Sequence, residues 1–401
     1  MHEKFIARQP IFDPRLRVFA YELLFRGGPQ NAFTPYANAS ASVIADSITL
    51  FDIQLLTGSA RAFINVDELA LRLGAPRLLP PDRIVVEILE TVQPSEEILS
   101  ICRELRDAGY SFALDDFIDA PQSRPFVDLA HFLKVDFQLL DPDERKALAA
   151  KYRGPNISLL AEKVETLQDL DEAKSLGFSY FQGYFFCKPS MIETREIPGN
   201  KIIQLQLLNA VAAPVLDFNP IEELLKQEPS LLYRLLRYLN SPVLGLRSEV
   251  HSVRQALSLL GEREFRRWVS VFSVIALSSG KPPEIIRTAL TRAYFCEEIS
   301  RHIGLQDNSS GLFLMGLLSV ADALLDKPMS EVLKLLPVSP EIKNALCGGQ
   351  NSFRDAYDLL LAFERADWAR LVTQIQRLGC TEENVPESYQ AAIQKASTIS
   401  L

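Results

Sequence analysis

The sequence predicts an α/β barrel followed by an all-helical domain, and three observations lead to this prediction. Short apolar runs alternate with helix-like stretches over about the first 190 residues, whereas only helical periodicity follows. Polar and acidic residues stand at the C-terminal ends of these runs. A polar segment containing Pro198 and Gly199 separates the two regions. We therefore expect domains at residues 1–192 and 201–401, joined by a linker at 193–200.

Eight runs rich in β-branched, aromatic and aliphatic residues are expected to form the strands of the barrel. They are Phe5–Ile11, Val18–Phe25, Phe63–Val66, Ile84–Leu89, Ser111–Leu114, Phe132–Val135, Ser158–Ala161 and Tyr180–Gln182. Helices are expected between them at Ala39–Thr49, Ser95–Ala108, Pro142–Lys151 and Leu167–Ser175. This alternation predicts parallel strands that close into a compact barrel of the TIM-barrel kind. A doubly wound open sheet is the alternative, although no G-x-G-x-x-G loop follows the first strand.

The second region has apolar residues at three- and four-residue spacing, which predicts helices throughout. The expected helices are Ile202–Val211, Leu231–Leu239, Val253–Leu260, Glu264–Leu277, Pro283–Ile303, Gly311–Leu324 and Phe353–Leu378. Proline-, glycine- and asparagine-rich segments separate them. The chain is therefore expected to end in an all-α domain.

Composition excludes several classes of protein. The 401-residue chain is 47% hydrophobic and carries a net charge of −9, which argues against binding to a nucleic-acid duplex. The N-terminus lacks a signal-peptide run, and the longest late apolar run, Val269–Leu277, is too short to span a bilayer. Five cysteines without C-x-x-C spacing are expected to be reduced thiols. We expect a cytoplasmic protein.

The strand ends are expected to form one polar site, because the C-terminal ends of barrel strands meet at one face. The residues concerned are Glu22, Asn65, Glu87, Asp115, Asp116, Lys134, Glu162 and Gln182. Adjacent carboxylates such as Asp115 and Asp116 repel each other unless a cation lies beside them, so Mg²⁺ or Mn²⁺ is the expected cofactor. Two-metal carboxylate sites serve attack on phosphodiesters, and Arg26 would suit a phosphate. The alternative for the Asp115–Asp116 pair is a solvated acidic turn.

Residues 4–190 resemble an EAL domain, the barrel family that hydrolyses or binds cyclic di-GMP. Its motifs recur in order. Glu22 and the residues up to Arg26 resemble the E-x-L signature with its following Arg, and Asn65 resembles the metal-binding Asn. Further matches are Glu87–Glu90 to E-L-T-E, Asp115–Phe117 to D-D-F, Lys134–Asp136 to K-x-D, Ala161–Thr166 to A-E-G-V-E-T and Gln182–Tyr184 to Q-G-Y.

The resemblance implies a role for each matching residue. Glu22, Asn65, Glu87 and Asp115 would be metal ligands. Asp116 and Glu165 would complete or bridge the metal site, and Lys134 would act on the attacking water. Arg26, Gln182 and Glu162 would contact the ligand or its water.

Three departures from the EAL motifs bear on activity. The loop after Phe117 reads Ile118–Gln122 and contains no glycine, whereas the family has a glycine-containing loop that couples metal binding to dimerisation. Lys163 replaces a glycine, and Leu89 replaces the threonine of E-L-T-E. These changes are the reason for expecting loss of turnover.

The second half resembles an HDOD domain, a degenerate relative of the HD phosphohydrolases. The resemblance rests on Glu228–Leu231, Leu239–Pro242, Ser252–Ala256 and Leu259–Gly261. Ser319 and Val320 stand where such enzymes have His and Asp, so this half is not expected to be an enzyme.

Together the resemblances indicate a bacterial-type EAL–HDOD (YuxH-like) signalling protein. Its barrel would bind cyclic di-GMP at a degenerate site, and its helical domain would contact a protein partner. The alternative is an active metal-dependent phosphodiesterase that releases the linear dinucleotide. A homodimer is compatible with either.

Overall fold

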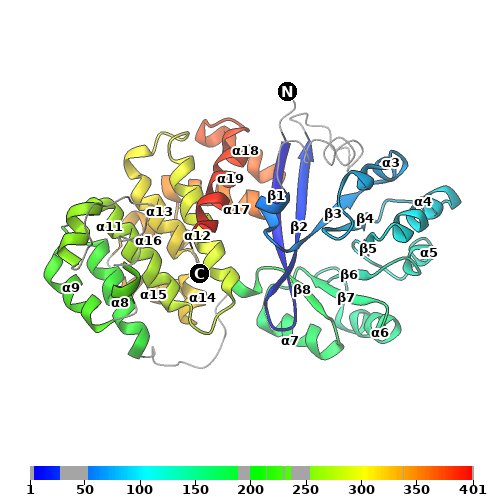
Figure 1. Cartoon of the computed structure of the whole chain (residues 1–401), viewed down its shortest axis with the longest axis horizontal. Coiled ribbons are helices and arrows are strands. Elements are labelled where there is room, and N and C mark those ends of the chain that lie inside the picture. Colours follow the sequence, from blue (N-terminus) through cyan, green and yellow to red (C-terminus); the bar gives the residue numbers. More distant parts are fainter. Residues whose placement is uncertain are drawn as a thin grey trace. The chain divides into compact units, whose positions relative to one another are not determined.

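The computed structural model contains two compact units, which are described separately (Figure 1). It describes residues 4–27, 53–187, 199–213, 215–228, 231–235, 253–336 and 338–399. The first unit holds Met1–Phe186 together with Leu361–Leu371, and the second holds Cys187–Leu360 and Val372–Leu401. The expected helix Ala39–Thr49 lies outside the described residues, and the expected linker at 193–200 stays a prediction.

The first unit is built on a closed eight-stranded barrel, which confirms the predicted fold. Its strands are β1 (Lys4–Phe12), β2 (Val18–Gly27), β3 (Arg61–Val66), β4 (Ile84–Ile88), β5 (Ser111–Leu114), β6 (Phe132–Asp136), β7 (Ser158–Glu162) and β8 (Tyr180–Gln182). They pair in sequence order from β2 to β8 as parallel neighbours.

The expectation that all strands are parallel is wrong for β1, which runs antiparallel to both β2 and β8. The reason is the short connection between β1 and β2. Its turn is closed by hydrogen bonds from Asp13 N to Arg17 O (2.9 Å) and from Leu16 N to Asp13 O (2.9 Å). Such a tight turn joins antiparallel strands, whereas a parallel pair needs a crossover of a dozen or more residues.

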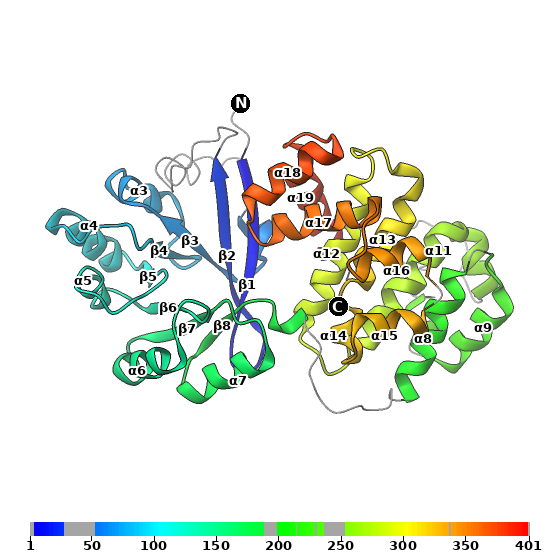
Figure 2. The ribbon, with the colours of Figure 1, turned by 180° about the vertical axis from the view of Figure 1, so that it is seen from behind.

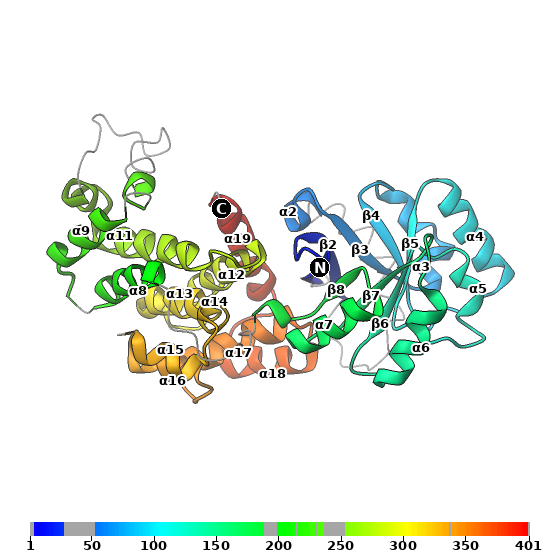
Figure 3. The ribbon, with the colours of Figure 1, turned by 90° about the horizontal axis from the view of Figure 1, so that it is seen from below.

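Helices cover the outside of the parallel strands, as Figure 3 shows for α4 to α7. They are α2 (Ile53–Thr57), α3 (Glu68–Arg72), α4 (Glu96–Asp107), α5 (Arg124–Val127), α6 (Pro142–Tyr152) and α7 (Leu167–Leu176), with short 3₁₀ turns at Ala75–Leu78 and Phe185–Cys187. Side-chain hydrogen bonds stabilise the N-termini of three of these helices. Ser95 caps α4, Asp141 forms a capping box at α6, and Thr166 forms one at α7.

The described residues of the second half of the chain are helical, as predicted, and the expected helix Leu231–Leu239 lies partly outside them. Its helices are α8 (Gly199–Ala212), α9 (Phe218–Gln227), α11 (Val253–Leu277), α12 (Pro283–Ile299), α13 (Ser309–Leu318), α14 (Ala321–Leu325), α15 (Met329–Leu335), α16 (Pro340–Leu346), α17 (Ser352–Glu364), α18 (Trp368–Leu378) and α19 (Asn384–Ser397), with a 3₁₀ turn at Gln306–Asn308. None of the helices among these described residues is long and apolar enough to cross a membrane.

Two long expected helices are each divided into two. The helix expected at Gly311–Leu324 stops at Leu318, where the Ser319 hydroxyl donates to the Gly316 carbonyl (2.7 Å). The helix expected at Phe353–Leu378 breaks at Ala366, whose φ is +54°. Side-chain periodicity continues across both breaks, so it could not reveal them.

Helix α12 is the centre of the second unit and packs against α13 and α19 (Figure 2). The approach of α13 depends on Gly316, because a Cβ there would lie 2.5 Å from the carbonyl oxygen of Arg292 on α12. Most of α12 is buried, including its charged residues Arg292, Glu297 and Glu298.

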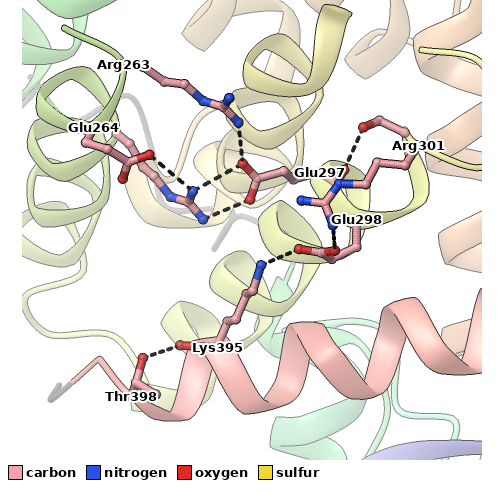
Figure 4. A network of polar contacts seen from close by, with 9 residues as sticks. Arg263, Glu264, Glu297, Glu298, Arg301, Lys395 and Thr398 are labelled. Atoms are coloured by element: carbon pink, nitrogen blue, oxygen red, sulfur yellow. Dashed lines mark hydrogen bonds and ion pairs between the residues drawn. The ribbon is translucent and has the colours of Figure 1, made fainter. Parts of the chain in front are cut away.

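Ion pairs join α12 to its neighbours (Figure 4). Glu297, whose side chain is 5% exposed, pairs with Arg263 (3.1 Å) and Arg267 (2.9 Å) of α11. Glu298 pairs with Lys395 of α19. A buried carboxylate is stable only with such partners, so the network fixes three helices to one another.

Candidate functional site

The predicted site forms the layer of side chains above the apolar interior of the barrel. That interior consists of Ile11, Ala20, Phe63, Val85, Ala113, Phe132 and Leu160, with Tyr180 packed against it. Residues two positions apart on a strand face the same side. The next layer toward the C-terminal ends of β2 to β8 therefore contains Glu22, Asn65, Glu87, Asp115, Lys134, Glu162 and Gln182.

Lys134 lies at the centre of this layer. Its fully buried Nζ is 2.9 Å from Asp115 Oδ1, 2.7 Å from Glu162 Oε1 and 3.4 Å from Glu22 Oε1, and it also pairs with Glu87. One ammonium thus faces four carboxylates. The cluster can accept further positive charge, because a buried anion needs a cation or hydrogen-bond donors beside it.

Burial and charge move the pKa values of the cluster in opposite directions. Burial raises the pKa of Glu162 to about 8, despite the nearby ammonium, and raises that of Glu87 well above its ordinary value. Burial alone would lower the pKa of Lys134, but Asp115, Glu162, Glu22 and Glu87 outweigh it and raise that pKa well above normal. The pKa of Asp115 is lowered: burial would raise it, but Lys134 and hydrogen bonds outweigh burial.

Side-chain amides orient Glu22. Asn65 Nδ2 donates to Glu22 Oε1 (3.3 Å), and Gln182 Nε2 donates to Glu22 Oε2. Gln182 Nε2 also donates to Oε1 of Gln9 (3.1 Å). Gln9 was missing from the sequence-based site, because β1 was expected to be parallel. In an antiparallel strand the next layer lies two residues before the interior residue, and two residues before Ile11 is Gln9.

The cluster fits a divalent cation. In the described part of the chain, Asn65 Oδ1 and Gln182 Oε1 are buried without a hydrogen-bond partner. Oxygen atoms of Glu22, Glu87 and Glu162 lie within 4.8 Å of one another, and so do oxygen atoms of Glu90, Asp115 and Asp116. Carboxylate and amide oxygens are the ligands that Mg²⁺ and Mn²⁺ prefer. Asp115 belongs to the second group, and its Oδ1 shares Lys134 Nζ with Glu22 and Glu87 of the first group.

Of three other predicted residues, two lie at the edge of the site, and the side chain of the third is outside what the structure describes. Asp116 is half-buried with φ +40°, and burial, reinforced by the charge of Asp115, raises its pKa. Glu165 is exposed and accepts a hydrogen bond from Gln138 Nε2 (3.0 Å). The side chain of Arg26, near the end of β2, is outside what the structure describes.

The glycine-free loop that follows Phe117 is tied to the barrel. Phe117 N donates to the carbonyl of Lys134 (2.8 Å), which places the start of the loop beside the site. Asp119 accepts from Arg124 Nε (2.9 Å) and from the Tyr152 hydroxyl (2.8 Å), and it pairs with Lys151 of α6. The loop is therefore held by side chains rather than shaped by glycines.

Both halves of the chain match known families. Residues 46–189 match the EAL domain and residues 197–334 match the HDOD domain. The matched EAL range starts after β2, so Glu22 lies outside it.

Similar proteins cover almost the whole chain. The cyclic di-GMP phosphodiesterase CdgJ of Vibrio cholerae is 35% identical over an alignment of 393 residues that covers 96% of this chain and 90% of CdgJ. The YuxH protein of Bacillus subtilis is 32% identical over an alignment of 374 residues that covers 91% of each chain. Among solved structures, the Bacillus subtilis YkuI protein, with an EAL domain, is 18% identical over 65% of this chain and 71% of that one, with a TM-score of 0.39. The chain belongs to the EAL–HDOD family, which joins an EAL barrel to a helical HDOD domain.

Proposed function

We propose that this protein is a metal-dependent cyclic di-GMP phosphodiesterase, which opens the cyclic dinucleotide to its linear form in signal transduction. The observation that supports this most is the buried cluster around Lys134, where four carboxylates share one ammonium and the Asn65 carbonyl oxygen has no partner among the described residues. The similarity to CdgJ, a cyclic di-GMP phosphodiesterase, supports the same reaction.

Four residues would hold the ion: Glu22, Asn65, Glu87 and Asp115. Mg²⁺ or Mn²⁺ fits these oxygen ligands, and when bound it would supply a polarised water and offset charge on the phosphate. In the reaction, a water gives up a proton as its oxygen forms a bond to phosphorus. The bond from phosphorus to the 3′ oxygen breaks, and that oxygen takes up a proton.

The other site residues position the reacting groups. The Lys134 ammonium can hold the attacking water and stabilise negative charge on the phosphate oxygens. Gln182, itself oriented by Gln9, and Glu162 would contact the ligand or its water. Arg26 would pair with a phosphate, and Asp116 and Glu165 would complete the metal site.

The test is to incubate the purified full chain with cyclic di-GMP and Mg²⁺ or Mn²⁺ and to follow the linear dinucleotide by liquid chromatography. Glu22→Ala should lower the rate by roughly 1000-fold or more, because it removes a ligand of the ion that stabilises the transition state. Glu104→Ala on α4 removes an exposed carboxylate distant from the cluster and should leave the rate unchanged. Absence of product, or a Glu22→Ala variant that stays active, would disprove the proposal.

A receptor is the second candidate, and the loop after Phe117 favours it. Asp119 ties this loop to Lys151 and Tyr152 of α6 and to Arg124 of α5, which opposes movement of the loop during a reaction cycle. In this case the barrel would bind cyclic di-GMP without turnover, and the HDOD unit would pass the signal to a protein partner. Binding of the intact dinucleotide, measured by calorimetry with no linear product, distinguishes the receptor from the enzyme.

A further inference from the structure

Lys163 has an unusual backbone conformation at the edge of the site. Its φ is +52°, a left-handed region that side chains other than glycine rarely adopt. The neighbouring backbone fixes this conformation: Val164 N donates to the Gln182 carbonyl (3.0 Å), and a Cβ on Gly183 would lie 2.0 Å from the Val164 carbonyl oxygen. Glycine would occupy this position without strain, so the presence of a lysine here points to a use for its side chain.

The side chain of Lys163 reaches the site because of this conformation. Successive residues of a strand face opposite sides, so an extended Lys163 would point away from the side that Glu162 faces. Instead, its Nζ pairs with Asp136 Oδ2 at the end of β6. Asp136 is buried, and its other oxygen accepts from Gln138 N (2.6 Å) and Leu139 N (3.1 Å).

The Lys163 ammonium lies on the Asp116 side of the site. Phe117 N, next to Asp116, donates to the carbonyl of Lys134 (2.8 Å), and Asp136, the partner of Lys163, lies two residues farther along β6. Asp116 belongs to the group with Asp115 and Glu90, where a second divalent ion would have its ligands. A fixed positive charge beside this group reduces the electrostatic attraction for such an ion.

We propose that the Lys163 ammonium takes the place of a second divalent cation, so that this barrel holds one ion instead of two. The inference rests on the metal-dependent function proposed above. That ion would be held by Glu22, Asn65, Glu87 and Asp115, as proposed above. Lys163 would offset the charge of Asp116 and Asp136 and would act as a positioning residue through its ion pair with Asp136.

The test counts Mn²⁺ ions bound per full chain, by electron paramagnetic resonance of free Mn²⁺ during titration. The wild type should bind one ion. Lys163→Gly, which suits the left-handed backbone, and Lys163→Met, which keeps the side-chain length without its charge, should both bind two. Lys163→Arg should still bind one. Lys146→Met removes an exposed lysine charge on α6 and serves as the matched control, with one ion expected.

Two ions in the wild type would overturn the inference and leave the proposed function intact. One ion in both Lys163→Gly and Lys163→Met would overturn it as well. No bound Mn²⁺ in any variant, with circular dichroism confirming that each is folded, would instead contradict the metal-dependent function and this inference with it. The ion count does not depend on turnover, so the two proposals fail in different ways.

Discussion

At the scale of single residues, Lys134 compensates the negative charge of the carboxylates buried in the barrel. It is fully buried, and four carboxylates converge on its ammonium. Removing one partner of a buried ionic cluster leaves the others uncompensated, and this costs about 3–5 kcal/mol in comparable cases. Lys134 is therefore expected to affect stability as well as chemistry.

The Lys134→Met variant should lower the free energy of unfolding by about 3 kcal/mol in metal-free buffer, because four carboxylates lose their shared cation. Urea unfolding followed by circular dichroism measures this change. Added Mn²⁺ should stabilise the variant more than the wild type, since the ion can replace the lost positive charge. The exposed Lys146→Met control should change stability by less than about 0.5 kcal/mol. If Lys134→Met had the same free energy of unfolding as the wild type, burial of the four carboxylates would not depend on the charge of this lysine.

Most residues of the site could be predicted from the sequence, for a physical reason. Each lies two positions after an interior apolar residue of its strand, and this period of two is visible in the sequence. Gln9 could not be placed without knowing that β1 is antiparallel. The ion pair of Lys163 with Asp136 was also hidden, because it depends on a backbone conformation that breaks the alternation of the strand.

At the scale of elements, local signals account for what could be predicted. Helix α6 begins at the Asp141 capping box and α7 ends at Gly177 in the left-handed region, and both signals are visible in the sequence. The break at Ser319 was not visible, because it depends on a hydroxyl that bonds to the preceding turn. The position of this break therefore depends on the hydrogen bond from Ser319 and not on the spacing of apolar residues.

The loop after Phe117 gives a prediction for the effect of pH. Hydrogen bonds from Lys151, Arg124 and Tyr152 lower the pKa of Asp119 below its ordinary value of 3.8. A carboxyl whose pKa is lower in the folded state stabilises the fold above the unfolded pKa, and this contribution is lost as the pH falls through the folded pKa. Asp119→Asn should therefore lower the urea midpoint at pH 6, and its difference from the wild type should shrink as the pH falls below 3.8.

The control for this measurement is Asp171→Asn on α7, which removes an exposed carboxylate elsewhere on the barrel. Its urea midpoint should follow that of the wild type at every pH. If Asp119→Asn also follows the wild type from pH 6 downward, the contacts of Asp119 do not stabilise the loop.

At the scale of the whole molecule, the barrel unit is not continuous in sequence. Leu361–Leu371 belongs to the same compact unit as Met1–Phe186. Within that unit, the Glu364 carbonyl accepts hydrogen bonds from Gln9 Nε2 (3.3 Å) and the Tyr184 hydroxyl (2.9 Å). Gln9 also orients Gln182, so a segment from the second half of the sequence supports the site.

A fragment ending at residue 192 should therefore be less stable than the barrel in the full chain. Loss of the two hydrogen bonds to Glu364 costs about 2 kcal/mol, which corresponds to a fall in melting temperature of about 4–8 °C for a domain of this size. Differential scanning calorimetry of the fragment and of the full chain measures the difference. Tyr184→Phe in the full chain removes one of these bonds and should reproduce about half of the change. A fragment that melts at the same temperature as the barrel in the full chain would mean that residues 1–192 fold without support from Leu361–Leu371.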